Sequence, residues 1–421
     1  MQAGFSKVSF LPPFTASLAG YGNGMPRHFS HVLDEPYARG VALSDGDTGV
    51  VVVATDFLTP TDRLCEVVRR RANLGPVEIV VHGTHTHSAP GNFWDHPIAV
   101  RMCGDFRQHA FDFLAERFAE AAARAWNSRE DATVSFDQDA DTLAHLQENR
   151  RRPDGPIDPV LSVWSFRAKS DGRPLGCAVN FAGHPVIVAE RDFHAVSADF
   201  PGFVARRLEA EFPVCAYFNG AVGGLSIWFP DKPIDVHLHL RTVGEPIARL
   251  AADLLARAQP MGDRLAFSRQ AVTLGKNNSD PLPFGWWWAP AVRPAVWYWN
   301  RLVATNYPSP RVTTVSALRL GESAMVFQPS DFGVGCGLAV REKGARRGIA
   351  AVPIGHADDY AGYIHPESEM TIAPKPGKDY RYLTIYENLM GFYGRSAYDL
   401  FAHAEDAALA AVLGDAATTA A

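Results

Sequence analysis

Two histidines, His85 and His87, stand two positions apart in the sequence GTHTHSAPG, directly after the apolar run 77–81. Side chains alternate along an extended chain, so both imidazoles are expected on the same side. Neutral imidazole is a common zinc ligand, and a second imidazole beside a metal can bind substrate or move a proton. The pair therefore indicates a metal site or an acid–base site, while two solvated loop histidines would give the same pattern.

A third histidine, His184, stands in NFAGHPVIV, again just past an apolar run. Taken alone, it fits a structural histidine as well as a metal ligand. The sequence contains no H-E-x-x-H motif, which excludes the common helical zinc-protease arrangement. Any zinc site in this chain must therefore be assembled from separate loops.

The elements that would position these residues follow a repeated pattern. A short apolar, β-branched run stops at a loop rich in Gly, His, Asp, Ser or Asn six times, at 50–54, 77–81, 177–181, 214–218, 324–327 and 349–354. Helical spacing of apolar residues separates some of these runs, as at 105–127 and 202–211. The alternation predicts an α/β fold, with mixed β-sheets flanked by helices and an active site built from loops at strand ends.

No linker or internal repeat divides the sequence, so one domain over residues 1–421 is expected. The segment after Gly394 has the pattern of a terminal helix, and we expect a frayed tail from about residue 408 to residue 421.

The composition excludes several classes of protein. The formal net charge of −6 is spread without long runs of one sign, which argues against a nucleic-acid partner. The five cysteines form no C-x-x-C pair, so neither a disulfide framework nor a thiolate zinc site is predicted. Because the N-terminus lacks an unbroken apolar region and no stretch of about 18 apolar residues occurs, we expect no transmembrane segment and a cytoplasmic location.

Several motifs occur in one order along nearly the whole chain. They are G-T-H-T-H-S-x-P-G at 83–91, N-F-A-x-H-P at 180–185, S-A-D-F-P-G at 197–202, a Gly-rich stretch ending in Ser226, Q-P-S-D-F at 328–332, Y-A-G-Y at 360–363 and Tyr386-Glu387. Together they resemble the catalytic domain of the neutral/alkaline, non-lysosomal ceramidase family.

The resemblance implies one zinc ion per chain, held by two histidines, a glutamate and a tyrosine. Motif matching transfers these ligands to His85, His184, Asp331 and Tyr363. Aspartate replaces glutamate at the third position and is one methylene shorter. Either the loop moves inward by roughly a bond length, or zinc binds through a different carboxylate geometry.

The same resemblance assigns a catalytic role to His87, Arg150 and Tyr386, where a cation and a phenol near the zinc would hold the carbonyl oxygen as it acquires charge. Ser226 matches a serine regarded as functional in the family, but this chain lacks the G-x-S-x-G elbow of serine nucleophiles. Ser9 stands where the family usually carries an acidic residue, which indicates an altered site.

We therefore predict a zinc-dependent hydrolase that cleaves the amide bond of a small, soluble N-acyl substrate other than ceramide. Two alternatives stay open: metal-assisted acyl transfer or cyclisation on a biosynthetic intermediate, and a catalytically silent metal- or ligand-binding homologue. The segment 284–300 holds five of the nine tryptophans and has no counterpart in the resemblance. It could pack on the core, form a contact in a homo-oligomer or line an apolar pocket.

Overall fold

The computed structural model describes residues 1–20, 27–97, 99–152, 154–227, 234–277, 311–370 and 381–414, with a few single positions between 279 and 301. For residues 381–385 it describes the backbone alone. Most of the tryptophan-rich segment 284–300 and the end of the tail, 415–421, lie outside the described residues.

A nine-stranded sheet forms the centre of the described structure, in the order β13-β11-β10-β8-β1-β5-β6-β7, with β15 paired to β8. Its members are β1 (Gln2–Ser9), β5 (Tyr37–Ser44), β6 (Gly49–Thr55), β7 (Glu78–Gly83), β8 (Glu130–Asp139), β10 (Leu161–Ala168), β11 (Pro174–Phe181), β13 (Cys215–Asn219) and β15 (Gln259–Pro260). The two outermost pairs, β6 with β7 and β11 with β13, are parallel, whereas the inner pairs are antiparallel. At both edges of the sheet, polar loops therefore follow the carboxyl-terminal ends of parallel strands.

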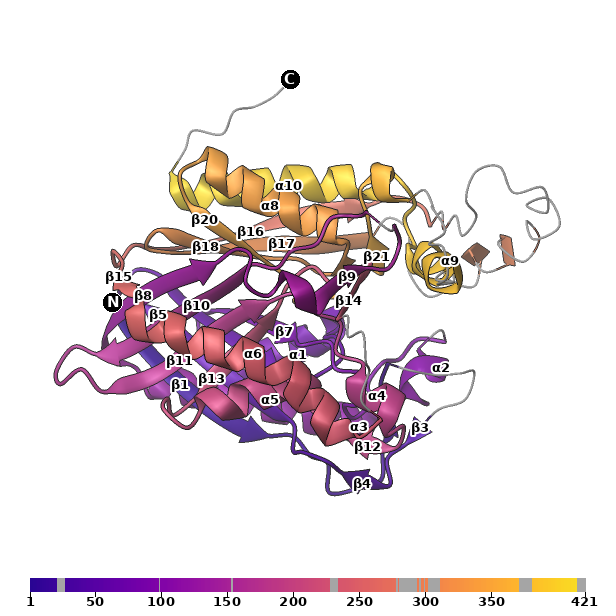
Figure 1. Ribbon diagram of the computed structural model, residues 1–421, viewed down its shortest axis with the longest axis horizontal. Coiled ribbons are helices and arrows are strands. Elements are labelled where there is room, and N and C mark those ends of the chain that lie inside the picture. Colours follow the sequence, from indigo (N-terminus) through magenta and orange to yellow (C-terminus); the bar gives the residue numbers. More distant parts are fainter. Residues whose placement is uncertain are drawn as a thin grey trace.

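A second, four-stranded sheet packs on one face of the first (Figure 1). Its order is β16 (Leu265–Leu274), β17 (Arg311–Leu320), β18 (Ser323–Phe327) and β20 (Ala350–Ile354), and only its last pair is parallel. Apolar side chains of both sheets form one core between them. The fully buried Trp164 crosses this core, and its Nε1–H donates to Ser323 Oγ at 2.9 Å.

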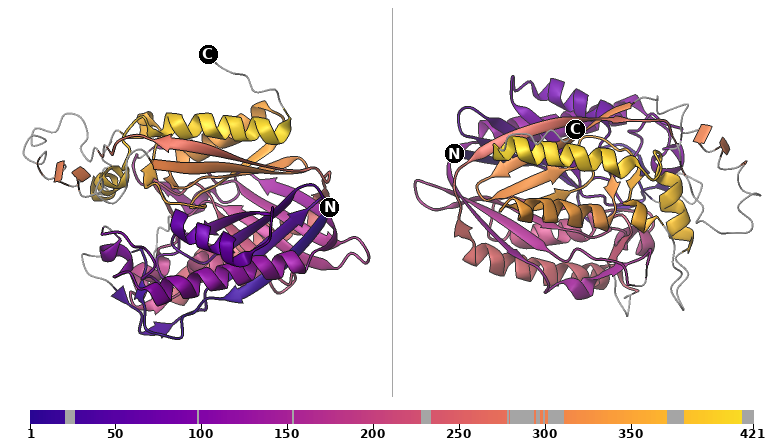
Figure 2. Two further views of the ribbon diagram at one scale, coloured as in Figure 1. Left: turned by 180° about the vertical axis from the view of Figure 1, so that it is seen from behind. Right: turned by 90° about the horizontal axis from the view of Figure 1, so that it is seen from above.

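Helices cover the two outer faces, which gives a helix–sheet–sheet–helix layering (Figures 1 and 2). On the four-stranded sheet lie α8 (Val334–Arg346) and α10 (Ala397–Leu413). On the nine-stranded sheet lie α1 (Asp62–Ala72), α3 (Gln108–Asn127), α5 (Asp199–Leu208) and α6 (Val236–Arg257). This arrangement confirms the predicted class of mixed sheets flanked by helices.

Short elements build the connections near the strand ends. They are β2 (Ser17–Leu18), β3 (Arg27–His28), β4 (His31–Val32), β9 (Gln147–Asn149), β12 (Ala195–Val196), β14 (Leu225–Ile227), β19 (Asp331–Phe332), β21 (Tyr363–Ile364), α2 (Val100–Cys103), α4 (Ile187–Arg191), α9 (Arg381–Met390), η1 (Ala144–Leu146) and η2 (Glu367–Glu369). Two of their pairings, β9 with β14 and β19 with β21, hold segments that carry predicted site residues.

Three predicted boundaries change. The helix expected at 202–211 is α5 and begins at Asp199, since Pro201 is tolerated in the first turn of a helix. The helix expected from 105 begins at Gln108. The tail expected to fray from about 408 remains helical to Leu413, because Leu409 and Val412 of α10 have buried side chains.

Within the described part of the chain, we find no helix long and apolar enough to cross a membrane.

Candidate functional site

Three predicted histidines meet at one point. His87 Nε2 lies 3.2 Å from His85 Nε2 and 3.2 Å from His184 Nε2. The three ring centres are 4.8, 4.8 and 5.1 Å apart. Nitrogen ligands at 2.0–2.1 Å from a tetrahedral zinc would be about 3.3 Å from one another, with ring centres about 5 Å apart. The spacing therefore suits imidazoles that surround a single ion.

Asp331 lies beside one of these histidines, His85, on a segment that follows the four-stranded sheet. It pairs with Tyr363 in register between β19 and β21, and its Oδ2 is 3.5 Å from His85 Nε2. The side chain is fully buried, and among the described residues neither carboxylate oxygen has a well-formed hydrogen bond. Burial raises the pKa of Asp331, while His85, the hydroxyl of Tyr363 and Arg150 oppose that rise. A buried carboxylate with so little compensation fits a site for a cation.

The imidazoles are in the form that a metal requires. Burial, with a smaller contribution from the neighbouring His356, lowers the pKa of His85 to about 3. Burial likewise lowers the pKa of His87 and His184 well below the usual value. The Nδ1–H of His85 donates to the carbonyl of Leu58 at 3.0 Å, which leaves the lone pair on Nε2. The rings are therefore neutral, and His85 is already oriented as a ligand.

The backbone at His85 differs from the extended chain expected from the sequence. Strand β7 ends at Gly83, and His85 has a left-handed conformation with φ of +69°. Its N–H donates to the carbonyl of Phe57 at 2.8 Å. His85 and His87 do reach the same point, but through a local reversal of the chain rather than through strand alternation.

Asn219, the last residue of β13, joins the loops that carry the histidines. Its Nδ2 donates to the carbonyl of Thr84 at 2.7 Å and to that of Gly183 at 2.9 Å, while its Oδ1 accepts the N–H of Gly183 at 3.1 Å. Its backbone N–H donates to His82 Nε2 at 3.1 Å, and its carbonyl accepts the N–H of Gly355 at 3.1 Å. The side chain is fully buried, so these bonds hold three strand-end loops in one place.

Arg150 enters the site as half of a buried ion pair. Its Nε donates to Glu387 Oε1 at 2.7 Å, and Arg151 Nη1 donates to Glu387 Oε2 at 2.6 Å. Burial alone would raise the pKa of Glu387, but the two guanidinium groups hold it well below its usual value. The charge of Arg150 is also close enough to Asp331 and Tyr363 to change their pKa values.

The other two predicted catalytic residues are placed differently. Tyr386 lies on α9, meets the ring of Tyr363 edge-on at 6.0 Å and lines the cavity in front of the histidines. Ser226 lies on β14 opposite Glu148, and it is not one of the described residues that line this cavity.

Gly20 forms another wall of this cavity, next to His87. Its φ is +106°, and a Cβ there would lie 2.6 Å from the imidazole of His87. The guanidinium of Arg27 donates to the backbone carbonyls of Ala19, at 3.0 Å, and of His87. The backbone of Gly20 therefore lies so close to His87 that any residue larger than glycine at position 20 would displace the imidazole.

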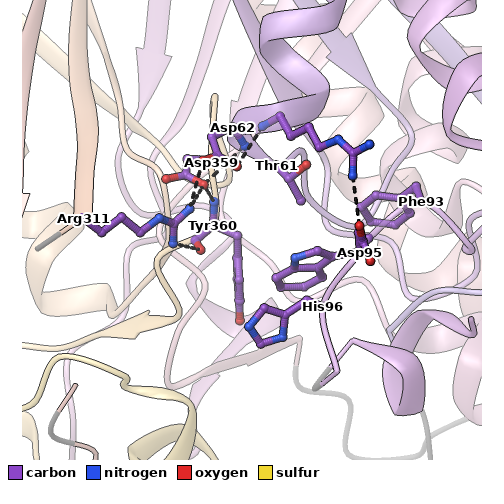
Figure 3. Close-up of a pocket in the computed structure, with 10 residues that line it drawn as sticks. Thr61, Asp62, Phe93, Asp95, His96, Arg311, Asp359 and Tyr360 are labelled. Atoms are coloured by element: carbon purple, nitrogen blue, oxygen red, sulfur yellow. Dashed lines mark hydrogen bonds and ion pairs between the residues drawn. The ribbon is translucent and has the colours of Figure 1, made fainter. Parts of the chain in front are cut away.

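Two cavities adjoin the cluster. The smaller, of about 20 Å³, is lined by the described residues Gly20, Leu58, Thr59, His85, His87, Trp94, Met102, Tyr360, Tyr363 and Tyr386. The larger, of about 200 Å³, shares Trp94 and Tyr360 with it. Figure 3 shows the larger cavity, with Arg311 pointing toward Asp359, and Asp95 lying on the far side beside Phe93.

Comparison with known proteins supports the fold. No family model matches the sequence. The neutral ceramidase from Pseudomonas aeruginosa superposes with a TM-score of 0.79 at 19% identity, covering 100% of this chain and 76% of that one. A ceramidase complexed with C2 superposes with a TM-score of 0.76 at 18% identity, with the same coverage. The predicted resemblance to neutral ceramidases is therefore confirmed at the level of the fold.

Three residues of the site had no role in the sequence interpretation: Asn219, Glu387 and His356. Glu387 was part of a recognised motif, but its two arginine partners are distant in sequence. His356 follows an apolar run in the same way as His85 and His184, so that pattern could have identified it.

Substituting Asn219 should disturb both folding and metal binding. We expect Asn219→Ala to lower the free energy of unfolding by about 2–4 kcal/mol, since two carbonyls and one N–H lose their partner, and to lower the zinc content. Asn180→Ala is the matched control, because Asn180 Nδ2 also bridges two buried carbonyls, those of Phe218 and Pro353, both at 3.1 Å. It should lose stability and keep its metal. Urea unfolding and elemental analysis measure the two effects, and equal metal loss in both variants would contradict the role of Asn219.

The buried His82 should make stability depend on pH. Burial lowers the pKa of His82 to about 3. Between pH 6.5 and 3, His82 is therefore protonated in the unfolded chain but neutral in the folded chain. Stability from His82 is therefore lost as the pH falls. From pH 7.5 to 5.5 the metal-free wild type should lose about 1 kcal/mol more than His82→Gln. Urea unfolding of both proteins at both pH values measures this difference, and parallel losses would show that His82 titrates normally.

Proposed function

We propose that this protein is a zinc-dependent hydrolase that cleaves an amide bond in an N-acyl compound. The observation that carries the proposal is the meeting of three neutral imidazoles beside a cavity, one of which, His85, also lies 3.5 Å from the buried carboxylate of Asp331. Nitrogen and carboxylate donors from separate loops, without thiolates, suit zinc.

The four residues that would hold the ion are His85, His184, Asp331 and Tyr363. Zinc bound in such a site acts as a Lewis acid on a carbonyl and makes water acidic near neutral pH. Tyr363 fits this set because it pairs with Asp331 between β19 and β21 and lines the cavity with His85. Burial and, after it, Asp331 raise the pKa of its phenol well above the usual value, and a divalent cation would reverse that effect.

His87 is proposed as the proton carrier rather than a ligand. The resemblance gives His87 this role, and its side chain is partly exposed, whereas those of His85 and His184 are only 4% and 3% exposed. A neutral imidazole that faces the substrate can accept a proton from water and return it to the leaving amine.

Arg150 and Tyr386 are proposed to bind the substrate carbonyl or a polar group next to it. The backbone N–H of Arg150 donates to the carbonyl of Gly224 at 2.8 Å, and Glu387 accepts from the guanidinium, so the side chain is oriented before substrate arrives. A donor that is already oriented requires no reorganisation as negative charge develops on the oxygen.

The cavity favours a small polar substrate. Asp62 and Asp95 lie at the exposed rim of the larger cavity, with side chains 65% and 63% exposed. Arg311, which also lines this cavity, is buried against Asp359. Trp94 and Tyr360 provide an apolar face at the entrance to the histidines. We therefore propose a soluble amide with hydrogen-bonding groups rather than ceramide, and we do not assign Ser226 a nucleophilic role.

The metal assignment can be tested by elemental analysis. We expect one zinc per chain in the wild type and none in His85→Ala or His184→Ala. His87→Ala should keep its zinc and lose turnover by about 10²-fold or more, the usual effect of removing a general acid/base. Loss of zinc from His87→Ala would instead make His87 a ligand, and stoichiometric zinc in the His85→Ala/His184→Ala double variant would reject the site.

The substrate class can be tested by assaying short N-acyl amides and long-chain ceramide side by side. We expect turnover of short amides only. A kcat/KM of about 10⁴ M⁻¹s⁻¹ or higher on ceramide, with no turnover of short amides, would contradict this. Adding a primary amine as a second acceptor distinguishes hydrolysis from acyl transfer: a new amide as the main product would favour the transferase alternative. No turnover of any acyl compound by the zinc-loaded protein would favour the silent homologue.

A further inference from the structure

His356 is a fourth histidine at the cluster, on the loop that follows β20. It is fully buried, and its backbone has a left-handed conformation with φ of +50°. Its N–H donates to the carbonyl of Ser330 at 3.1 Å, and its carbonyl accepts the N–H of Gly83 at 3.0 Å. The backbone is therefore fixed between the residue before Asp331 and the end of β7.

The ring of His356 differs from that of His82 in its hydrogen bonding. Neither Nδ1 nor Nε2 has a hydrogen bond to any described residue. His82 is equally buried, but its Nδ1 bonds to the carbonyl of Gly355 at 2.8 Å and its Nε2 accepts the N–H of Asn219 at 3.1 Å. An unsatisfied buried polar group costs about 1–3 kcal/mol. His82 thus has the bonding of a structural histidine, whereas His356 lacks it.

The geometry argues against His356 as a ligand of the same ion as His85. The two rings are stacked, with centres 3.9 Å apart and planes 21° apart. A bound ion lies close to the plane of each imidazole, so stacked rings cannot share one, unlike the three rings about 5 Å apart. A second ion is also disfavoured, because the Nδ1–H of His85 is bonded to Leu58 and its Nε2 has a single lone pair.

The Asp331 carboxylate is the polar group to which the ring of His356 can donate a hydrogen bond. His356 Nε2 lies 3.8 Å from Asp331 Oδ2, longer than a hydrogen bond by about 1 Å. A rotation of the carboxylate would close this gap. Asp331 is also one methylene shorter than the glutamate that the resemblance predicts, so its carboxylate needs support to reach an ion.

We propose that His356 is a positioning residue, which donates its Nε2–H to the Asp331 carboxylate and holds it toward the metal. This inference rests on the proposed function, because it requires an ion at the cluster. Residues behind the ligands typically orient them in this way and change metal affinity by about 10–100-fold.

The test compares three variants at His356. Gln can place an amide N–H near the position of Nε2, Asn can place one only near Nδ1, and Leu has none. We expect His356→Leu and His356→Asn to weaken zinc binding by about 10–100-fold and His356→Gln to recover most of the affinity. Adding Asp331→Glu to His356→Leu should also restore binding, since the longer carboxylate reaches without support. Asn180→Ala, which removes a buried bridge between the carbonyls of Phe218 and Pro353, is the control and should lose stability while its zinc affinity stays unchanged.

Zinc affinity is measured by competition with a chromogenic chelator, and the visible spectrum of the Co²⁺-loaded proteins reports the geometry of the ligands. The His356→Leu and His356→Asn spectra should differ from the wild type, and the His356→Gln spectrum should match it. The inference would be overturned if all three variants kept the wild-type zinc affinity and spectrum, or if His356→Gln and His356→Asn lost zinc affinity equally. Neither result would reject the zinc site itself. A wild type that binds neither Zn²⁺ nor Co²⁺ would reject the proposed function itself.

Discussion

The carboxamide of Asn219 is the constraint on which the rest of the site depends. Its side chain bonds to the backbone of both loops that carry His85 and His184, and its main chain bonds to the imidazole of His82 in β7 and to Gly355 after β20. Each of its polar groups has a partner in a fully buried position. Moving one of the three loops away would leave buried polar groups of Asn219 without partners, which is costly in free energy. The bonds of Asn219 therefore keep the three loops together.

The site forms where two sheets meet. His85 and His184 follow strands at opposite ends of the nine-stranded sheet, whereas Asp331, His356 and Tyr363 belong to the segments that follow the four-stranded sheet. Neither sheet alone carries both the imidazoles and the carboxylate. The core between the sheets, which includes Trp164, therefore determines the distance between the two halves of the proposed ligand set.

Charge at the cluster is arranged in two parts. Arg150 and Arg151 are both paired with Glu387, which offsets one of their two positive charges, while Asp331 lies beside His85, whose ring burial keeps neutral. The first part can persist in the folded protein without a ligand. The second part leaves one carboxylate with little compensation, and a divalent cation is the simplest species that would balance it.

The sequence by itself determined the α/β class, the six strand runs and the strand-end positions of His85 and His184. These are local signals, because a buried strand must be apolar and its end must become polar. Only the tertiary structure decided how these residues are used. His82 and His356 are both buried histidines near strand ends. His82 is hydrogen-bonded through both ring nitrogens, whereas His356 is bonded through neither to any residue that the structure describes. The difference arises from which backbone groups lie across from each ring, and those groups are far away in the chain.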